Sequence, residues 1–215
     1  MPESNATIRR RYGPLASIYD WANLEGVLYA DARARAIDRL DLRPGARVLN
    51  VACGTGVNFT LIEQRIGPSG ELVGVDLTAG MLDRARARIA RKGWHNVRLR
   101  QLDICDVKPG ELGEPFDAAV CTLGFSVIPQ WQRAWETMRA SVRPGGRLAI
   151  MDAGYPADGA DASSARPLAW ALSRLFAADC TRRPWRLLQR DTAQATAEAF
   201  TLGWVTAAAG TAPAP

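Results

Sequence analysis

Two glycines and an aspartate lie at the ends of two predicted strands, where they could hold a nucleotide. The apolar run at 46–51 fits a buried parallel strand, and Gly54 and Gly56 after it allow a sharp turn that a Cβ would obstruct. A second short apolar strand at 71–76 ends at Asp76, 20 residues after Gly56. Nucleotide-binding α/β proteins place an acidic side chain against ribose hydroxyls at this distance, because one crossover helix separates adjacent strand ends.

The glycine pair alone is also compatible with a plain tight turn, and it does not complete a dinucleotide motif. A dinucleotide-binding turn would need a third glycine near Phe59 or Thr60, and neither position has one. The spacing to Asp76 therefore favours a ligand at the strand ends without identifying it.

Strand and helix patterns alternate along most of the chain. Helices are expected near 57–66, 79–92 and 131–142, between strands at 46–51, 71–76, 97–102, 116–121 and 146–152. This alternation predicts an α/β fold with a doubly wound, mostly parallel sheet and helices on both faces. Two further runs, 193–201 and 203–209, predict a terminal antiparallel hairpin.

The length and charge fit a single domain that does not bind nucleic acid. A chain of 215 residues suffices for one substantial core, expected at 46–210, with a helical cap over 1–43 and a disordered tail at 211–215. The net charge of +5 permits an acidic ligand or an anionic membrane surface, but many arginine-rich enzymes share it. The basic residues of 79–92 mostly decorate a solvated face, and the aromatic interleaving of a nucleic-acid site is missing.

The sequence offers no metal site and no membrane span. Its four cysteines form no Cys-x-x-Cys pair, and the sole histidine, His95, is expected in a loop. The N-terminus lacks the apolar core of a signal peptide, and no apolar run approaches the length of about 20 residues that crosses a bilayer. A reduced, cytoplasmic protein, soluble or peripheral to the inner face of the membrane, is the simplest interpretation.

Four stretches resemble the cofactor site of class I S-adenosylmethionine-dependent methyltransferases. Residues 48–56 and 74–82 resemble its glycine turn and ribose-binding strand end, 101–106 the acidic segment beside the adenine, and 142–151 the turn into strand five. They follow one another in the family's order. The resemblance implies a Rossmann-like sheet of seven strands, S-adenosylmethionine as cofactor and S-adenosylhomocysteine as product.

The resemblance also assigns the cofactor's contacts. The amides of 53–56 would face the methionine part, Asp76 the ribose hydroxyls and Asp103 the adenine amine. Either aspartate could instead serve as a helix N-cap or loop acid. Because the cofactor carries both methyl group and leaving group, the protein need only bind, align and desolvate. The implied cofactor-binding set is Asn50, Ala52, Cys53, Gly54, Thr55, Gly56, Asn58, Asp76, Leu77, Met81, Asp103, Ile104, Thr122 and Leu123.

Two positions depart from the family's pattern. The family usually has an acid where this chain has Asn50, and often a glycine where it has Ala52. An asparagine removes a charge that would complement the cofactor's ammonium group. A site that binds the cofactor without transferring a methyl group is therefore an alternative hypothesis.

The acceptor is expected to be hydrophobic. Residues 121–131 are apolar, contain no acid, and lack the Asn-Pro-Pro-Tyr type of sequence that resembles enzymes methylating nucleobases or glutamine. Together with 17–20 and 200–210, they resemble small bacterial methyltransferases of phospholipid and quinone biosynthesis. Tyr19 is then the candidate catalytic residue, as an aromatic lid over the pocket. Phosphatidylethanolamine, a quinone precursor and another natural product are the candidate acceptors.

Residues 167–190 combine Trp, Leu and Phe with many arginines. This pattern suits a segment lying at an anionic membrane interface. It equally suits an amphipathic helix that covers the active site with its arginines in water. The sequence leaves both interpretations open, as it does the oligomeric state.

Overall fold

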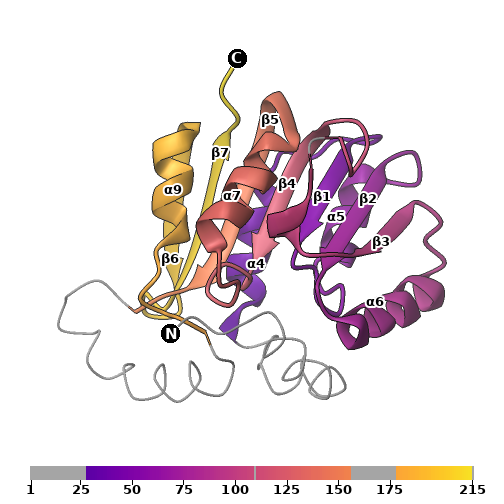
Figure 1. Cartoon of the computed structure of the whole chain (residues 1–215), viewed down its shortest axis with the longest axis horizontal. Helices are drawn as coiled ribbons and strands as arrows, with labels where there is room; N and C mark the ends of the chain where they lie inside the picture. The colour runs from indigo at the N-terminus through magenta and orange to yellow at the C-terminus, as the bar shows by residue number, and fades with distance from the viewer. Residues whose placement is uncertain (1–27, 109, 156–177, 215) are drawn as a thin grey trace.

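Seven strands pair into one sheet in the computed structural model, which describes residues 28–108, 110–155 and 178–214. The strand order is β3-β2-β1-β4-β5-β7-β6 (Figure 1). The pairs from β3 to β5 are parallel, and β7 is antiparallel to both β5 and β6. The predicted doubly wound sheet and terminal hairpin are thus confirmed. The strands are β1 Arg47–Val51, β2 Glu71–Asp76, β3 Val97–Gln101, β4 Phe116–Thr122, β5 Val142–Ala153, β6 Ala193–Phe200 and β7 Val205–Thr211.

Helices cover both faces of the sheet, as Figure 1 shows with α7 and α9 in front and α4 behind. Successive strand residues serve opposite layers because side chains alternate, so Val48 packs in the first layer and Leu49 in the second. The first layer contains α4 (Ala30–Asp38), α5 (Phe59–Ile66) and α6 (Ala79–Lys92), and the second contains α7 (Trp131–Ala140), α9 (Pro184–Asp191) and the 3₁₀ helix η1 (Ile104–Asp106).

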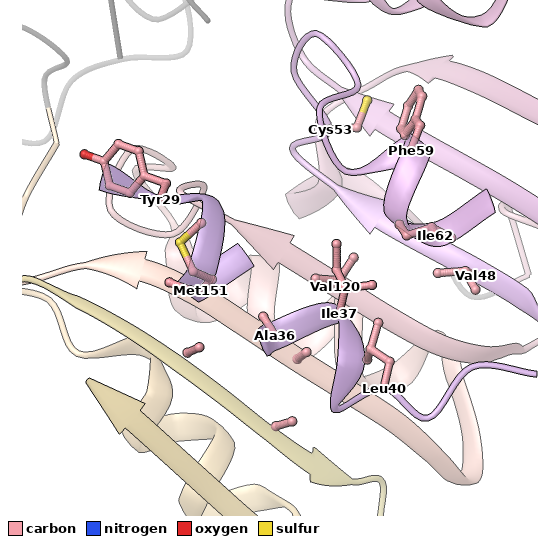
Figure 2. Packing of buried hydrophobic residues seen from close by; sticks show 14 of the residues in the cluster. Tyr29, Ala36, Ile37, Leu40, Val48, Cys53, Phe59, Ile62, Val120 and Met151 are labelled. Carbon is pink, nitrogen blue, oxygen red and sulfur yellow. The ribbon is translucent and has the colours of Figure 1, made fainter. Parts of the chain in front are cut away.

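Helix α4 is held against the middle of the sheet by its apolar stripe. Figure 2 shows Ala36, Ile37 and Leu40 beside Val120 of β4 and Met151 of β5, and all five side chains are buried. This packing fixes the rotation of α4 about its axis. The preceding residues 1–27, including Tyr12 and Tyr19 of the expected cap, lie outside the described residues.

Helix α7 packs into the second layer as its spacing predicts. Trp135 and Met138 are fully buried, and Trp131 is partly buried against the same cluster. The Trp135 indole Nε1 also donates a hydrogen bond to Asp191 at 2.8 Å, which joins α7 to α9.

The sheet extends beyond the predicted strand limits at two points. Strand β5 begins at Val142, which pairs with Phe116, and a shift in register before Arg147 accommodates the Pro144 turn. At the other end, the prediction of a disordered tail from Thr211 is wrong for the first two residues. Thr211 pairs with Arg147, and the Ala212 amide donates to the Gly146 carbonyl at 2.8 Å, so backbone hydrogen bonds continue the sheet here.

The described part of the segment 167–190 packs onto the protein. Leu188 is fully buried, and Trp185 and Leu187 pack against the second layer. The Arg182 side chain is only 13% exposed. These contacts account for the apolar residues of α9 without a membrane surface. Within the described ranges, no helix is long and apolar enough to span a bilayer.

Candidate functional site

A cavity lies at the carboxyl ends of β1, β2 and β4, where the connections of the sheet reverse direction. Ligands bind at such switch points in open α/β sheets. Three of the lining side chains are charged, namely Arg33, Asp76 and Asp103. The remaining lining residues are Ala52, Cys53, Gly54, Thr55, Val57, Val75, Leu77, Thr78, Met81, Leu102, Ile104, Thr122, Leu123, Gly124, Val127, Ile128 and Pro129.

The glycine turn after β1 is shaped by left-handed backbone angles. Gly54 has φ +55° and Gly56 has φ +78°, and a Cβ on Gly56 would lie 2.7 Å from the Phe59 ring. Ala52 also has a positive φ, +48°, which is unfavourable for a residue with a Cβ and accounts for the glycine usual there in similar chains. Gly54 differs from Gly56, since a Cβ on it would meet no described atom within 4 Å.

Asp76 connects the glycine turn to the start of α6. One carboxylate oxygen accepts a hydrogen bond from the Gly54 amide and the other from the Thr78 amide, each at 2.9 Å. Burial raises the pKa of Asp76, and the bonds from these amides oppose the rise. Thr78 is the N-cap residue of α6, but its side chain makes no capping bond and interacts with Asp76 instead. Asp76 is therefore a loop acid that also lines the cavity.

Asp103 likewise combines the two predicted roles. It is the N-cap of η1, and its carboxylate accepts a hydrogen bond from the Cys105 amide at 2.9 Å. It also lines the cavity, as do Ile104, Leu77 after β2 and Met81 of α6. The structure thus brings the ends of three neighbouring strands to one cavity.

Arg33 is a site residue that the sequence pattern misses. A charged side chain on α4 is expected to lie off the apolar stripe, but Arg33 is only 6% exposed and lines the cavity. Its guanidinium donates hydrogen bonds to Asn58 Oδ1 and, at 2.6 Å, to Thr122 Oγ1. The available signal was its position four and seven residues before Ile37 and Leu40, which places Arg33 on the buried face of the helix.

Asn50 and Asn58 lie behind the cavity surface. Both are buried, and neither is among the lining residues; Gly56 is not among them either. Asn58 Nδ2 donates to Asn50 Oδ1 at 3.0 Å and to Thr122 Oγ1 at 3.1 Å. Position 50 therefore reaches the cavity indirectly, through Asn58 and its contact with Arg33. A neutral amide suits this position, since a carboxylate would be fully desolvated.

The opposite wall of the cavity is apolar. It is formed by Leu123, Val127, Ile128 and Pro129, which follow β4. Leu123 has φ +54°, a second non-glycine residue at the rim in the left-handed region. Such strained backbone is concentrated at functional sites. The site thus has charged side chains on α4 and at the ends of β2 and β3, and apolar residues after β4.

The cysteines and His95 supply no further chemistry at this cavity. Burial raises the pKa of the Cys53 thiol well above its usual value, and Asp76 raises it further, so the thiol stays protonated. All four cysteines are free, and no group of three or more metal-ligating side chains occurs among the described residues. His95 lies in the predicted loop and does not line the cavity.

Comparison with known proteins is consistent with this geometry. Residues 48–146 match the family described as a methyltransferase domain. Over 138 residues the chain is 31% identical to the arsenite methyltransferase of Halobacterium salinarum, covering 64% of this chain and 34% of that protein. It is 24% identical over 151 residues to the demethylmenaquinone methyltransferase of Listeria monocytogenes, covering 69% and 63%.

A solved structure shares the fold over nearly the whole length. The SAM-dependent methyltransferase of Aquifex aeolicus superposes with a TM-score of 0.59 at 15% identity, covering 98% of this chain and 99% of that one. The chain spans between a third and two thirds of the length of the two curated relatives above. Residues 48–146 are thus similar to a methyltransferase domain, and the Aquifex aeolicus structure shows that the chain shares the fold of a SAM-dependent methyltransferase.

Proposed function

We propose that this chain is an S-adenosylmethionine-dependent methyltransferase that acts on a small hydrophobic acceptor. The observation that carries the proposal is the cavity lining, which has charged side chains on α4 and at the ends of β2 and β3, and apolar residues after β4. A cofactor that carries both a nucleoside and a charged amino acid needs the charged groups. An apolar acceptor needs the apolar residues.

The donors and acceptors present fit S-adenosylmethionine. Asp76 lines the cavity, and its carboxylate oxygens are acceptors of the kind that ribose hydroxyls need. Leu77 and Met81 offer apolar surface for the adenine, with Asp103 for its amine. Arg33 would hold the carboxylate of the methionine part, because a guanidinium matches a carboxylate in charge and geometry. The open space beside Gly54 admits a ligand close to the backbone.

The bound cofactor supplies an activated methyl group and its own leaving group. The residues of the chain then orient and desolvate. Arg33, Asp76 and Asp103 would fix the cofactor at three points. The apolar residues after β4 would exclude water and contact an apolar acceptor beside the cofactor; they are Leu123, Val127 and Ile128. None of these steps requires a metal or a strong nucleophile from the protein.

Several acceptors suit the apolar wall. A quinone precursor is supported by the similarity to a demethylmenaquinone methyltransferase. Phosphatidylethanolamine is the lipid alternative, and membrane contact through 167–190 would accompany it. Another natural product would enter from solution. The non-catalytic hypothesis, which began from Asn50, is the alternative, and the transfer of labelled methyl groups distinguishes it from catalysis.

Calorimetric titration with S-adenosylhomocysteine tests the cofactor site. We expect binding by the wild type and a loss of about 10- to 100-fold in affinity for Asp76→Asn, because a hydrogen bond to a charged group contributes about 1.5–3 kcal/mol. Asp83→Asn, an exposed change on α6, is the matched control and should bind as the wild type does. Equal affinity in Asp76→Asn and the wild type would contradict the assignment.

Transfer of labelled methyl groups then tests the acceptor. The protein is incubated with methyl-labelled S-adenosylmethionine and either a lipid extract or a polar metabolite extract. Label in a quinone fraction supports the quinone precursor, label in phospholipid supports phosphatidylethanolamine, and label in the polar extract supports a water-soluble product. Binding of S-adenosylhomocysteine without transfer into either extract would favour the non-catalytic module.

A further inference from the structure

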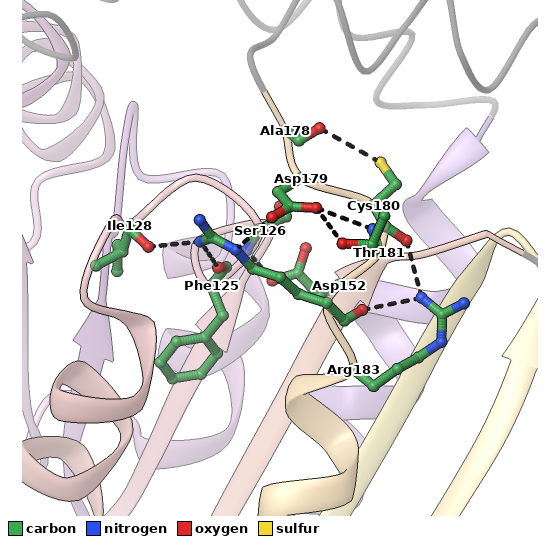
Figure 3. A network of polar contacts seen from close by, with 10 residues as sticks. Phe125, Ser126, Ile128, Asp152, Ala178, Asp179, Cys180, Thr181 and Arg183 are labelled. Atoms are coloured by element: carbon green, nitrogen blue, oxygen red, sulfur yellow. Dashed lines mark hydrogen bonds and ion pairs between the residues drawn. The ribbon is translucent and has the colours of Figure 1, made fainter. Parts of the chain in front are cut away.

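The apolar residues after β4 belong to a loop that is hydrogen-bonded to a segment distant in sequence. We call residues 123–130 the β4 loop and residues 178–183 the clasp segment. Figure 3 shows the two side by side, with Phe125, Ser126 and Ile128 of the loop facing Asp179, Cys180 and Thr181. The Asp179 amide donates to the Ser126 carbonyl at 2.8 Å. The backbone of the clasp segment therefore holds the loop at its centre.

Arg182 holds the β4 loop at two further points. One nitrogen of its guanidinium donates to the Phe125 carbonyl at 2.7 Å and to the Ile128 carbonyl at 2.6 Å. Its Nε donates to Asp179 at 3.1 Å, which orients the guanidinium. With 13% of its side-chain surface exposed, Arg182 is largely shielded from water, so these bonds are not easily replaced by solvent.

The same loop is fixed from beneath by Asp152, at the end of β5. This fully buried carboxylate accepts a hydrogen bond from the Ser126 amide at 3.0 Å and from the Ala153 amide at 2.8 Å. The clasp segment is anchored in turn, because the Tyr155 amide donates to the Cys180 carbonyl at 2.8 Å. Arg183 donates to the Cys180 and Tyr155 carbonyls, each at 2.8 Å. The β4 loop is thus hydrogen-bonded both to Asp152 and to the clasp segment.

The opposite side of the cavity does not depend on these contacts. Its glycine turn is held by Asp76 and by the bond from the Cys53 amide to the Val75 carbonyl at 2.9 Å. Within the β4 loop, the amides of Val127 and Ile128 both donate to the Gly124 carbonyl, so the loop forms a tight turn. Arg182 spans that turn from Phe125 to Ile128 and restrains the residues that line the cavity.

We propose that Arg182 is a positioning residue that fixes the acceptor-side wall of the cavity, leaving the cofactor side to other contacts. Its effect on the acceptor rests on the function proposed above. Loss of Arg182 would leave two loop carbonyls without their donor and free Val127 and Ile128 to move. Acceptor recognition would weaken, while cofactor affinity would stay close to that of the wild type.

Hydrogen exchange followed by mass spectrometry tests the restraint itself and needs no acceptor. With S-adenosylhomocysteine present, peptides covering 125–128 should exchange at least tenfold faster in Arg182→Met than in the wild type, with β1 unchanged. Arg182→Lys keeps one donor group and should fall between them. Arg186→Met removes an exposed arginine of α9 and is the matched control. Unchanged exchange at 125–128 in Arg182→Met would overturn the proposal.

A second pair of measurements separates positioning from general damage. The dissociation constant of S-adenosylhomocysteine should change less than twofold in Arg182→Met. The amount of methyl-accepting extract that gives half-maximal transfer should rise at least fivefold, with partial rescue in Arg182→Lys. A parallel loss of cofactor affinity, or an unchanged half-saturating amount, contradicts the proposal. If the wild type fails to bind S-adenosylhomocysteine, the proposed function fails. Hydrogen exchange without ligand then still shows whether Arg182 restrains the β4 loop.

Discussion

At the scale of single residues, the burial of Arg33 is the strongest chemical feature of the site. Removing a guanidinium from water is costly unless it is hydrogen-bonded, and Arg33 donates to Asn58 and Thr122. Arg33 also lines the cavity. A guanidinium there matches an anionic group, such as the carboxylate of the methionine part, in charge and geometry.

Substitution of Arg33 should discriminate between ligands that have this carboxylate and ligands that lack it. For Arg33→Met we expect binding of S-adenosylhomocysteine to weaken at least tenfold, about 1.4 kcal/mol, because a charge-assisted bond is lost. Binding of methylthioadenosine, which has no amino-acid part, should change less than twofold. Isothermal titration of both ligands makes the comparison.

The comparison of the two ligands also distinguishes a specific loss of binding from unfolding. A variant with a damaged fold would lose both ligands together, and Arg33→Lys, which keeps the charge, should recover part of the affinity for S-adenosylhomocysteine. Equal losses for the two ligands in a variant with wild-type thermal stability would show that Arg33 does not meet the carboxylate.

At the scale of elements, the glycine turn joins β1 to α5, and its two glycines have different roles. Gly56 serves the fold, because a Cβ there would lie 2.7 Å from the Phe59 ring. Gly54 lines the cavity, and a Cβ there would meet no described atom within 4 Å. Both have positive φ, so either substitution carries a backbone cost.

Alanine at each glycine should therefore produce opposite patterns. We expect Gly56→Ala to lower the free energy of unfolding by about 2–4 kcal/mol, from backbone strain and overpacking together. Gly54→Ala should lower the free energy of unfolding by about 1–2 kcal/mol, from backbone strain alone. Relative to this loss of stability, its loss of affinity for S-adenosylhomocysteine should be larger than in Gly56→Ala. Urea denaturation and ligand titration of both variants give the two quantities. Similar destabilisation by both changes would argue against the role of Phe59.

The elements were predictable because their signals are local. Alternating apolar strands and helix-period patterns give the sheet, the crossover helices and the hairpin at Ala193–Phe200 and Val205–Thr211. The extension of β5 back to Val142 was not predictable, since Pro144 and Gly145 resemble a turn and only pairing with Phe116 makes Val142 part of the strand. Pairing between distant segments leaves no local pattern.

The candidate site was predictable in part for the same reason. Asp76 and Asp103 stand at strand ends, and the sheet brings strand ends together. Arg33 was missed because its partner Thr122 lies 89 residues away. Asn50 is expected at the cofactor by resemblance, and in the structure it is buried and accepts a hydrogen bond from Asn58. Which polar group reaches the cavity surface depends on packing that no single segment encodes.

At the scale of the whole molecule, Asp152 should couple stability to pH. Burial raises the pKa of this carboxyl to about 6, although hydrogen bonds from Ser126 and Ala153 oppose the rise. The folded protein therefore binds this proton more tightly than the unfolded chain does. Its contribution to stability is fully present below the unfolded pKa of about 3.9 and is lost as the pH rises through 6.

Asp152→Asn removes this titration. We compare the free energy of unfolding of the variant with that of the wild type at pH 4 and at pH 7.5. The difference should shift in favour of the variant by up to about 3 kcal/mol between the two pH values. Altered hydrogen bonding at position 152 adds the same amount at both pH values and does not affect this shift. Urea denaturation at the two pH values measures the change.

Asp117→Asn provides a control of opposite sign. Burial acts to raise the pKa of Asp117, but the Arg47 amide and the Arg143 guanidinium lower it overall. Its contribution is present above the unfolded pKa and is lost as the pH falls, so Asp117→Asn should lose stability relative to the wild type as the pH rises. A difference between wild type and Asp152→Asn that is constant with pH would contradict the account of Asp152.

A crystal structure with bound S-adenosylhomocysteine would locate every part of the ligand at once. We expect the ribose beside Asp76, the adenine beside Asp103 and the amino-acid carboxylate at Arg33. Ligand density in another part of the molecule, or an amino-acid end turned away from Arg33 with the adenine remote from Asp103, would contradict it.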